Sequence, residues 1–143
     1  MSFNKFTLEE YNATSKNTLM DNIGIEYTLV EEGRVEAVMP VDNRNCQPFS
    51  VLHGGATLSL AETVAGLGSL VYCAENQLAV GMQISGSHVS SAPVGDTVHA
   101  IATIIHKGHK THVWNVDIFT SSNKLVSTVR VTNSIIERRQ NGY

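Results

Sequence analysis

Residues that would mark a secreted, metal-binding or membrane protein are scarce in this 143-residue chain. It has only two cysteines, Cys46 and Cys73, which form neither a CxxC motif nor a zinc-ligand spacing. We expect reduced thiols, with a single disulfide as the alternative. The longest apolar stretch is interrupted by Glu62, Gly66 and Gly68, so no membrane-spanning helix is predicted. The first residues show no signal-peptide pattern, and we expect a cytoplasmic protein without a metal.

Charge is also scarce, because Asp, Glu, Lys and Arg make up only 16% of the residues. The net charge is −3 and the pI is near 6.0, which argues against a dedicated nucleic-acid binder. The hydrophobic fraction of 42% is typical of a globular protein, and the length suits one domain over residues 1–143. So little charge also suggests that another subunit covers part of the surface.

The hydrophobic pattern predicts the order helix, two strands, one long helix, four strands. Thr7–Glu10 matches a capping box and begins a short helix that we place at about 7–16. After a connection, alternation predicts two strands in a hairpin, at about 25–30 and 35–41, and a polar loop follows. Further strands are predicted at about 78–90, 97–106, 112–120 and 125–136, with a frayed tail over 138–143.

Between residues 54 and 74 the hydrophobic period changes to that of a helix. One apolar stripe runs through Leu60, Val64, Leu67 and Val71, and a second stripe runs beside it. A helix that is apolar on most sides lies in a core or an interface. The short links between the strands suit an antiparallel sheet wrapped around this helix, which is an α+β architecture.

Glu62 is the one carboxylate inside this apolar helix, and no Lys or Arg occurs between Arg44 and Lys107. A carboxylate that is buried without a partner is costly to ionise and is seldom kept for stability. Upstream, Val51–Gly55 indicates a loop that leads into a helix N-terminus, where free N–H groups can polarise a carbonyl or hold an anion. A base or nucleophile beside such a helix end indicates attack on an activated acyl group.

Gly54 and Glu62 are eight residues apart in the sequence. On one helix this separation is about 12 Å of rise, so a carbonyl at the Gly54 N–H lies too far from the Glu62 of the same chain. Two such helices packed antiparallel about a two-fold axis would bring each Glu62 to the other helix N-terminus. The chemistry therefore predicts an isologous homodimer, the commonest symmetric assembly.

The segment Gln47–Ala56, followed by Leu60–Glu62, resembles the signature of hotdog-fold acyl-CoA thioesterases. The resemblance is to the PaaI-like branch that acts on aromatic thioesters such as 1,4-dihydroxy-2-naphthoyl-CoA and hydroxybenzoyl-CoA. Met39–Val41, Ser87–Val89 and residues 113–119 extend the likeness over nearly the whole chain. It implies a hotdog-fold acyl-CoA thioester hydrolase that works without a cofactor, as a homodimer or a homotetramer.

By this resemblance, Glu62 is the nucleophile or the general base, and the Gly54 N–H is the oxyanion donor. Gln47 contacts the thioester region, and His53 orders the loop or the substrate. The resemblance also implies contacts to the substrate or its CoA from Gly81, His88, Val89, Ser90, Ser91, His106, Lys107, Gly108, His109, Lys110 and Thr111.

Two positions depart from the pattern of the resembled branch. A hydroxyl residue often follows the glutamate by one helical turn and positions water, but here that place is Gly66, with Thr63 and Ser59 as substitutes. A basic residue often found two positions after the strand histidine is Ser90. The glycine keeps open a second function, a non-catalytic acyl-CoA binding module. A third, a dehydratase of similar fold, would need a proline-rich segment that is not found here.

The basic cluster at 106–112 allows two interpretations, a solvated hairpin turn or a seat for CoA phosphates. Its histidines at 106, 109 and 112 have a regular spacing. On a strand-turn-strand segment this spacing gives no shared face, which argues against a metal site.

Overall fold

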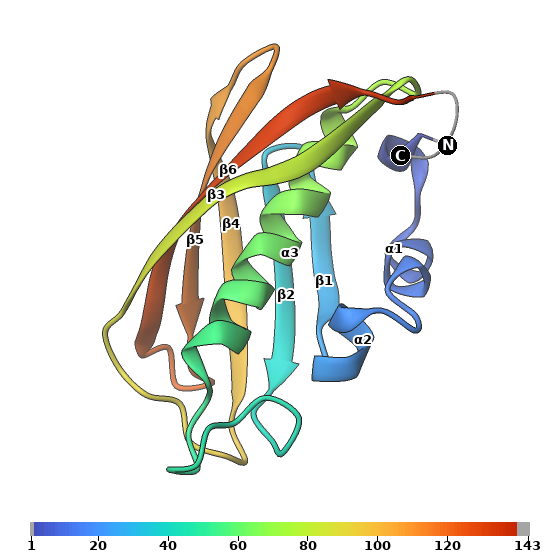
Figure 1. Cartoon of the computed structure of the whole chain (residues 1–143). Helices are drawn as coiled ribbons and strands as arrows, with labels where there is room; N and C mark the ends of the chain where they lie inside the picture. Colours follow the sequence, from blue (N-terminus) through green and yellow to red (C-terminus); the bar gives the residue numbers. More distant parts are fainter. Residues whose placement is uncertain (1, 140–143) are drawn as a thin grey trace.

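The computed structural model describes residues 2–139. Six antiparallel strands form one sheet in the order β1-β2-β4-β5-β6-β3, and the long helix α3 lies across it (Figure 1). This is the predicted α+β arrangement. The elements are η1 Phe3–Lys5, α1 Leu8–Thr14, α2 Leu19–Ile23, β1 Glu26–Glu31, β2 Arg34–Pro40, α3 Gly54–Tyr72, β3 Gln77–His88, β4 Thr97–Lys107, β5 Thr111–Phe119 and β6 Leu125–Glu137.

The N-terminal capping box is confirmed, since the Glu10 N–H donates to Thr7 Oγ1 and the Thr7 N–H donates to Glu10 Oε2. Helix α2 lies where the sequence indicates only a connection, because a five-residue helix is too short for apolar periodicity to register. Arg138 lies in the predicted tail, and its N–H donates to the Asn76 carbonyl. Residues 140–143 of that prediction lie outside the described residues.

The two edges of the sheet differ in length and exposure. Strand β1 has six residues, whereas β3 has twelve and pairs only with β6. From Gly81 to His88 every β3 residue except the half-buried Ile84 is exposed, including Met82 at 60%. Native proteins usually cover or blunt a long edge strand that carries apolar side chains. The β3 edge is therefore a candidate for contact with a second chain.

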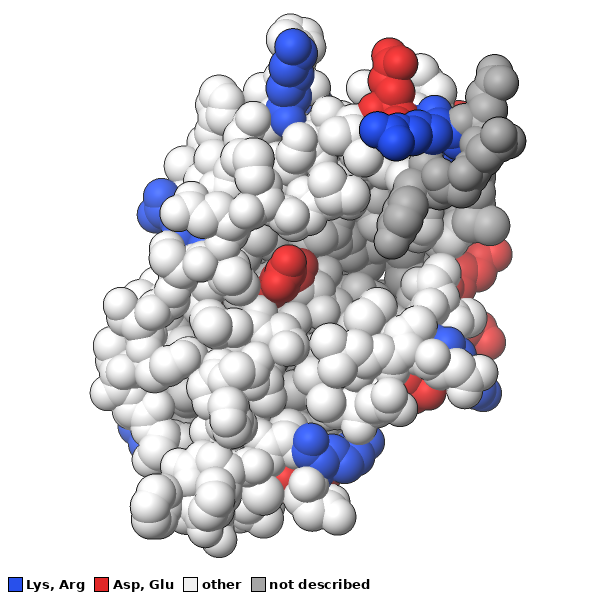
Figure 2. All heavy atoms as spheres, in the orientation of Figure 1, with Lys and Arg blue, Asp and Glu red and all other residues white. Residues whose placement is uncertain are grey.

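The face of the molecule that carries α3 has few charged side chains. Figure 2 shows most of them near its margins, with one acidic side chain alone near the middle of the view. Such a surface can approach another protein surface with little loss of ionic hydration. Among residues 2–139, no helix combines the length and the apolar character needed to cross a membrane.

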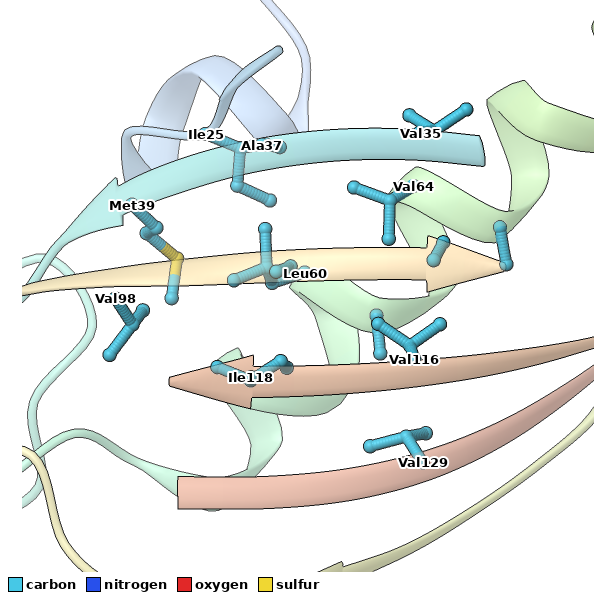
Figure 3. Close-up of a cluster of buried hydrophobic side chains, with 14 of the residues drawn as sticks. Ile25, Val35, Ala37, Met39, Leu60, Val64, Val98, Val116, Ile118 and Val129 are labelled. Atoms are coloured by element: carbon cyan, nitrogen blue, oxygen red, sulfur yellow. The ribbon is translucent and has the colours of Figure 1, made fainter. Parts of the chain in front are cut away.

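The core lies between α3 and the inner face of the sheet. Figure 3 shows Leu60 and Val64 of α3 among side chains from β4, β5 and β6, including Val98, Val116 and Val129. Strand β5 alternates buried and half-exposed residues along its whole length, as an antiparallel strand with one covered face requires. The apolar period of the sequence therefore marks the residues that hold the helix in place.

Ser69 of α3 lies at the centre of a fully buried polar cluster. Its hydroxyl oxygen accepts hydrogen bonds from Trp114 Nε1–H at 2.9 Å and from the Asn133 amide at 3.0 Å. His112 Nδ1 lies 3.0 Å from the same oxygen. With both lone pairs occupied, the Ser69 O–H must donate to His112 Nδ1, which leaves the ring neutral with its proton on Nε2. Burial, first of all, and then the nearby Lys107 and His106 lower the pKa of His112.

This cluster predicts a specific loss of stability in mild acid. Because the folded state lowers the pKa of His112, its contribution is complete above the unfolded pKa of about 6.5 and declines as the pH falls below it. The free energy of unfolding should fall as the pH drops below about 6.5, by at most about 1.4 kcal/mol per pH unit. Denaturant unfolding of the native protein and of His112→Gln measures this, and the variant should lack this part of the slope. Identical pH profiles for both proteins would contradict the assignment.

Candidate active site

Glu62 lies on the side of α3 that faces α2 and the start of β1. Its carboxylate is exposed in the single chain, which corrects the expectation of a buried group, because the surrounding apolar positions do not enclose it within one subunit. It shares a pocket of about 430 Å³, called here the Glu62 pocket, whose lining is Leu19, Met20, Tyr27, Ser59, Glu62, Thr63, Gly66 and Leu67. No salt bridge of the described residues involves Glu62.

Gly81 explains how the carboxylate lies against the β3 edge. A Cβ built at Gly81 would collide with Glu62 Oε1, so only glycine lets the carboxylate approach the strand backbone. Gly81 stands at a break in the β3–β6 register, between Gly81 and Gln83. The structure thus brings Gly81 to Glu62, away from the other predicted substrate contacts of its strand.

Gly54 is the first residue of α3. Of the N–H groups in the first turn, from Gly54 to Thr57, that of Gly54 has no acceptor in the described part of the chain. His53 caps the helix, because His53 Nδ1 accepts from the Gly55 N–H at 2.8 Å. The N–H groups of Ala56 and Thr57 donate to the His53 carbonyl. Within residues 2–139, the Gly54 N–H has no acceptor. This N–H is therefore available to an incoming oxygen atom.

A second pocket, of about 280 Å³, opens beside Gly54 and is called here the helix-start pocket. It brings together Gly54 and the predicted contacts on and after β3; its lining is Leu52, Gly54, Thr57, His88, Val89, Ser90, Ser91, Ala92 and Val126. Glu62 is absent from it. The structure therefore agrees with the helix geometry: one chain holds the donor and the carboxylate at separate places.

His88 lines the helix-start pocket and packs against the first residue of α3. Its Nδ1 lies 2.7 Å from the buried Ser127 hydroxyl, which orients the ring. A Cβ at Gly54 would lie only 2.7 Å from His88 Nε2, so the imidazole edge covers the start of α3. When Ser127 donates to Nδ1, the proton of the neutral ring is on Nε2, next to the free Gly54 N–H. Sequence reasoning missed Ser127, because nothing in the pattern of β6 pairs it with His88.

Gln47 and His53 are not in the lining of either pocket. Gln47 Oε1 accepts from the Phe49 N–H at 2.6 Å, and the Gln47 N–H donates to the Val51 carbonyl. Both residues therefore shape the loop before α3. For His53 this is the loop-ordering role that the sequence left as one of two options.

The predicted CoA seat at 106–111 forms the β4–β5 hairpin, and its residues line neither of these pockets. Lys107 Nζ lies 4.2 Å from the centre of the Tyr72 ring, a cation–π contact. The Gly108 N–H donates to the Thr111 carbonyl, so it closes the turn and is not free for a phosphate. His106, His109 and Lys110 are exposed. Within residues 2–139, no three His, Cys, Asp or Glu side chains cluster closely enough to hold a metal ion.

The pocket walls outside the motif could not be found from the sequence. Ser59 and Thr63 are exceptions, since the sequence offers them as substitute hydroxyl residues and both line the Glu62 pocket; Ser59 Oγ donates to the Gly55 carbonyl at 2.9 Å. Leu19, Met20 and Tyr27 come from distant segments and meet α3 only in the folded chain. In the sequence these three residues are recognisable only as apolar or aromatic. That character is equally typical of ordinary core residues, so it does not identify a pocket wall.

Comparison with known proteins places these residues in a recognised family. Residues 49–127 match the thioesterase superfamily. The chain is 37% identical over 130 residues to the proofreading thioesterase EntH of Cronobacter turicensis, covering 91% of this chain and 94% of that one.

Solved structures agree with this match. The crystal structure of a thioesterase from Haemophilus influenzae is 39% identical, covers all of both chains and has a TM-score of 0.91. A thioesterase enzyme from Staphylococcus aureus, solved with a glutamine replaced by alanine, is 35% identical with a TM-score of 0.79 and covers 82% of this chain and 97% of that one. The same protein was also solved with a glutamate replaced by alanine. The hotdog fold expected from the sequence is confirmed.

The capping role of His53 is testable by substitution. His53→Ala removes the acceptor of the Gly55 N–H and should lower the free energy of unfolding by about 1 kcal/mol. His53→Asn supplies another capping oxygen and should recover most of this loss. Denaturant titration of both variants measures the difference. Equal stability of His53→Ala and the native protein would show that the cap contributes nothing.

Proposed function

We propose that this chain, which belongs to the thioesterase superfamily and is a thioester hydrolase, cleaves acyl-CoA thioesters at sites that two copies of the chain build together. In each site, the thioester oxygen lies on the Gly54 N–H of one copy. Glu62 of the other copy attacks the carbonyl carbon or activates the water that does so. The acyl group is aromatic, as the resembled branch of the family suggests.

The arrangement of β3 is the observation that carries this proposal. Glu62 lies against Gly81 on this strand, and Gly54 lies against His88 near its other end. Suppose that two β3 edges pair antiparallel about a two-fold axis near Ile84 or Ser85. Gly81 of one strand then lies opposite the partner's His88, to within about one residue. Each Glu62 thereby comes close to the partner's Gly54, which is the pairing that the reaction needs.

The exposed β3 edge supports the same dimer. Pairing would satisfy the free backbone groups of the strand and cover exposed apolar side chains such as Met82 and Val89. It would also join the α3 faces, which carry little charge. Two six-stranded sheets would become one continuous sheet, with both catalytic sites at the seam.

The related Staphylococcus aureus enzyme supports the choice of residues. Its two alanine variants replace a glutamine and a glutamate that are 15 positions apart in that chain. Gln47 and Glu62 have the same separation here. The match in residue type and spacing favours a shared role for the pair, in which Gln47 holds the loop that presents the Gly54 N–H.

The proposed reaction needs only groups of the protein and water. As Glu62 or water adds to the carbonyl carbon, negative charge moves to the thioester oxygen. The Gly54 N–H faces that oxygen, and a donor of this kind lowers the barrier by roughly 3 to 4 kcal/mol. The carbon–sulfur bond then breaks, and CoA leaves as the thiolate. If Glu62 attacks directly, water hydrolyses the resulting anhydride and restores the carboxylate; neither route needs a metal or cofactor.

Exposed cations of the β4–β5 hairpin suit the phosphates of CoA. Lys107 and Lys110 stand on the hairpin surface, with His106 and His109 beside them. The hairpin residues line neither the Glu62 pocket nor the helix-start pocket, so we place the nucleotide end of CoA on the hairpin and the thioester end at the seam. The Gly108 N–H takes no part, since it is bonded within the turn.

Substitution of the carboxylate tests this function. Glu62→Gln should lower kcat for benzoyl-CoA hydrolysis by at least about a hundredfold, because an amide can neither attack nor accept the proton. Thiol release followed with a colorimetric reagent measures the rate. Glu62 is exposed in the single chain and forms no salt bridge among residues 2–139, so thermal unfolding should barely change.

A second glutamate gives the matched control. Glu75 is also exposed and follows α3, outside both pockets, so Glu75→Gln should keep native activity. A folded Glu62→Gln protein with the native rate would end this mechanism.

A further inference from the structure

Two glycines inside α3, Gly66 and Gly68, have very different surroundings. A Cβ at Gly68 would lie 2.5 Å from a ring carbon of Trp114, so the close approach of the indole requires glycine there. A Cβ at Gly66 would meet no atom within 4 Å. A glycine in a helix interior destabilises the helix relative to alanine. Packing within the chain accounts for Gly68 and leaves Gly66 unexplained.

The place of Gly66 in the site suggests what the missing side chain leaves room for. Gly66 follows Glu62 by one helical turn, and both line the Glu62 pocket. The wall opposite α3 is apolar and comes from Leu19 and Met20 of α2. Any side chain at position 66 would enter the space between this wall and the carboxylate.

The size and lining of the pocket indicate the group that fits it. The pocket measures about 430 Å³, whereas an apolar cavity of about 150 Å³ already holds a benzene molecule. Leu19, Met20 and Leu67 offer apolar contact, and no Lys or Arg lines the pocket. The geometry favours a compact, uncharged and bulky acyl group, such as an aromatic ring attached directly to the thioester carbonyl.

We infer that Gly66 is a specificity-determining residue: its bare backbone leaves the space beside Glu62 in which a bulky acyl group lies under the wall formed by α2. This inference rests on the proposed function and adds the element that selects the acyl group. The inference also explains why a helix-destabilising glycine occupies a position where the methyl group of an alanine would contact no other atom of the chain.

The test compares two thioesters on variants of the two glycines. The measured quantity is the ratio of kcat/KM for benzoyl-CoA to kcat/KM for acetyl-CoA. Gly66→Val should lower this ratio by at least about tenfold, because an extra apolar group in a substrate pocket changes discrimination by 10 to 200-fold. Gly66→Ala should shift the ratio the same way by less, and should raise the thermal unfolding temperature because alanine favours the helix.

Gly68→Ala is the matched control in the same helix. Its methyl group would press on Trp114, away from the Glu62 pocket, so it should lower stability and leave the substrate ratio unchanged.

Three results would overturn the inference. One is an unchanged ratio in Gly66→Val, and another is the same shift in Gly68→Ala. The third is a loss of stability or of the dimer in Gly66→Ala, which would show that the glycine serves contact between copies. Failure of the proposed function looks different, because the native protein would then cleave neither thioester or Glu62→Gln would remain active.

Discussion

The rigidity of α3 is the constraint from which the proposed site follows. A continuous 19-residue helix fixes Gly54 and Glu62 about 12 Å apart, and no adjustment of side chains closes that distance. The structure assigns the two residues to separate pockets and ties each to a different part of β3, Gly54 to His88 and Glu62 to Gly81. One chain therefore holds two half-sites of the proposed active site, one with Gly54 and one with Glu62. A two-fold axis across β3 would pair the half-sites of two chains and so form two complete sites. In this account dimerisation is part of catalysis.

The interior of the fold explains why the helix can serve as a fixed spacer. Ser69 is bonded to side chains from β5 and β6, and Trp114 packs against the bare backbone of Gly68. These contacts hold the C-terminal half of α3 on the sheet, while the His53 cap orders its first turn. The carboxylate of Glu62 lies two turns before Ser69, exposed and free of salt bridges among residues 2–139. Stability and the proposed chemistry thus use different turns of one helix, so a variant at Glu62 is expected to separate them.

Much of the fold could be predicted because periodicity and local motifs carry it. The change from alternation to helical spacing marks α3, and the capping box at Thr7 marks α1. Features set by long-range contact could not be predicted. Strand β3 pairs with β6 at the end of the sheet, and α2 forms one wall of the Glu62 pocket, although neither arrangement leaves a local signal. The exposure of Glu62 in the single chain could not be predicted for a related reason. An apolar helix face indicates that the face is covered, but it does not tell whether the same chain or a second copy covers it.

The shared site is tested most directly by mixing two inactive proteins. Glu62→Ala lacks the carboxylate. Gly54→Pro lacks the N–H, at a first helical position whose φ suits proline and after an extended residue. Gly54→Ala is its control, because both variants add a Cβ close to the His88 ring and only Gly54→Ala keeps the N–H. If each site takes Glu62 from one chain and Gly54 from the other, unfolding and refolding an equal mixture of Glu62→Ala and Gly54→Pro should restore about a quarter of native activity. Half of the random dimers are then mixed, and each mixed dimer holds one intact site. A refolded mixture of dimers with no activity would contradict the account.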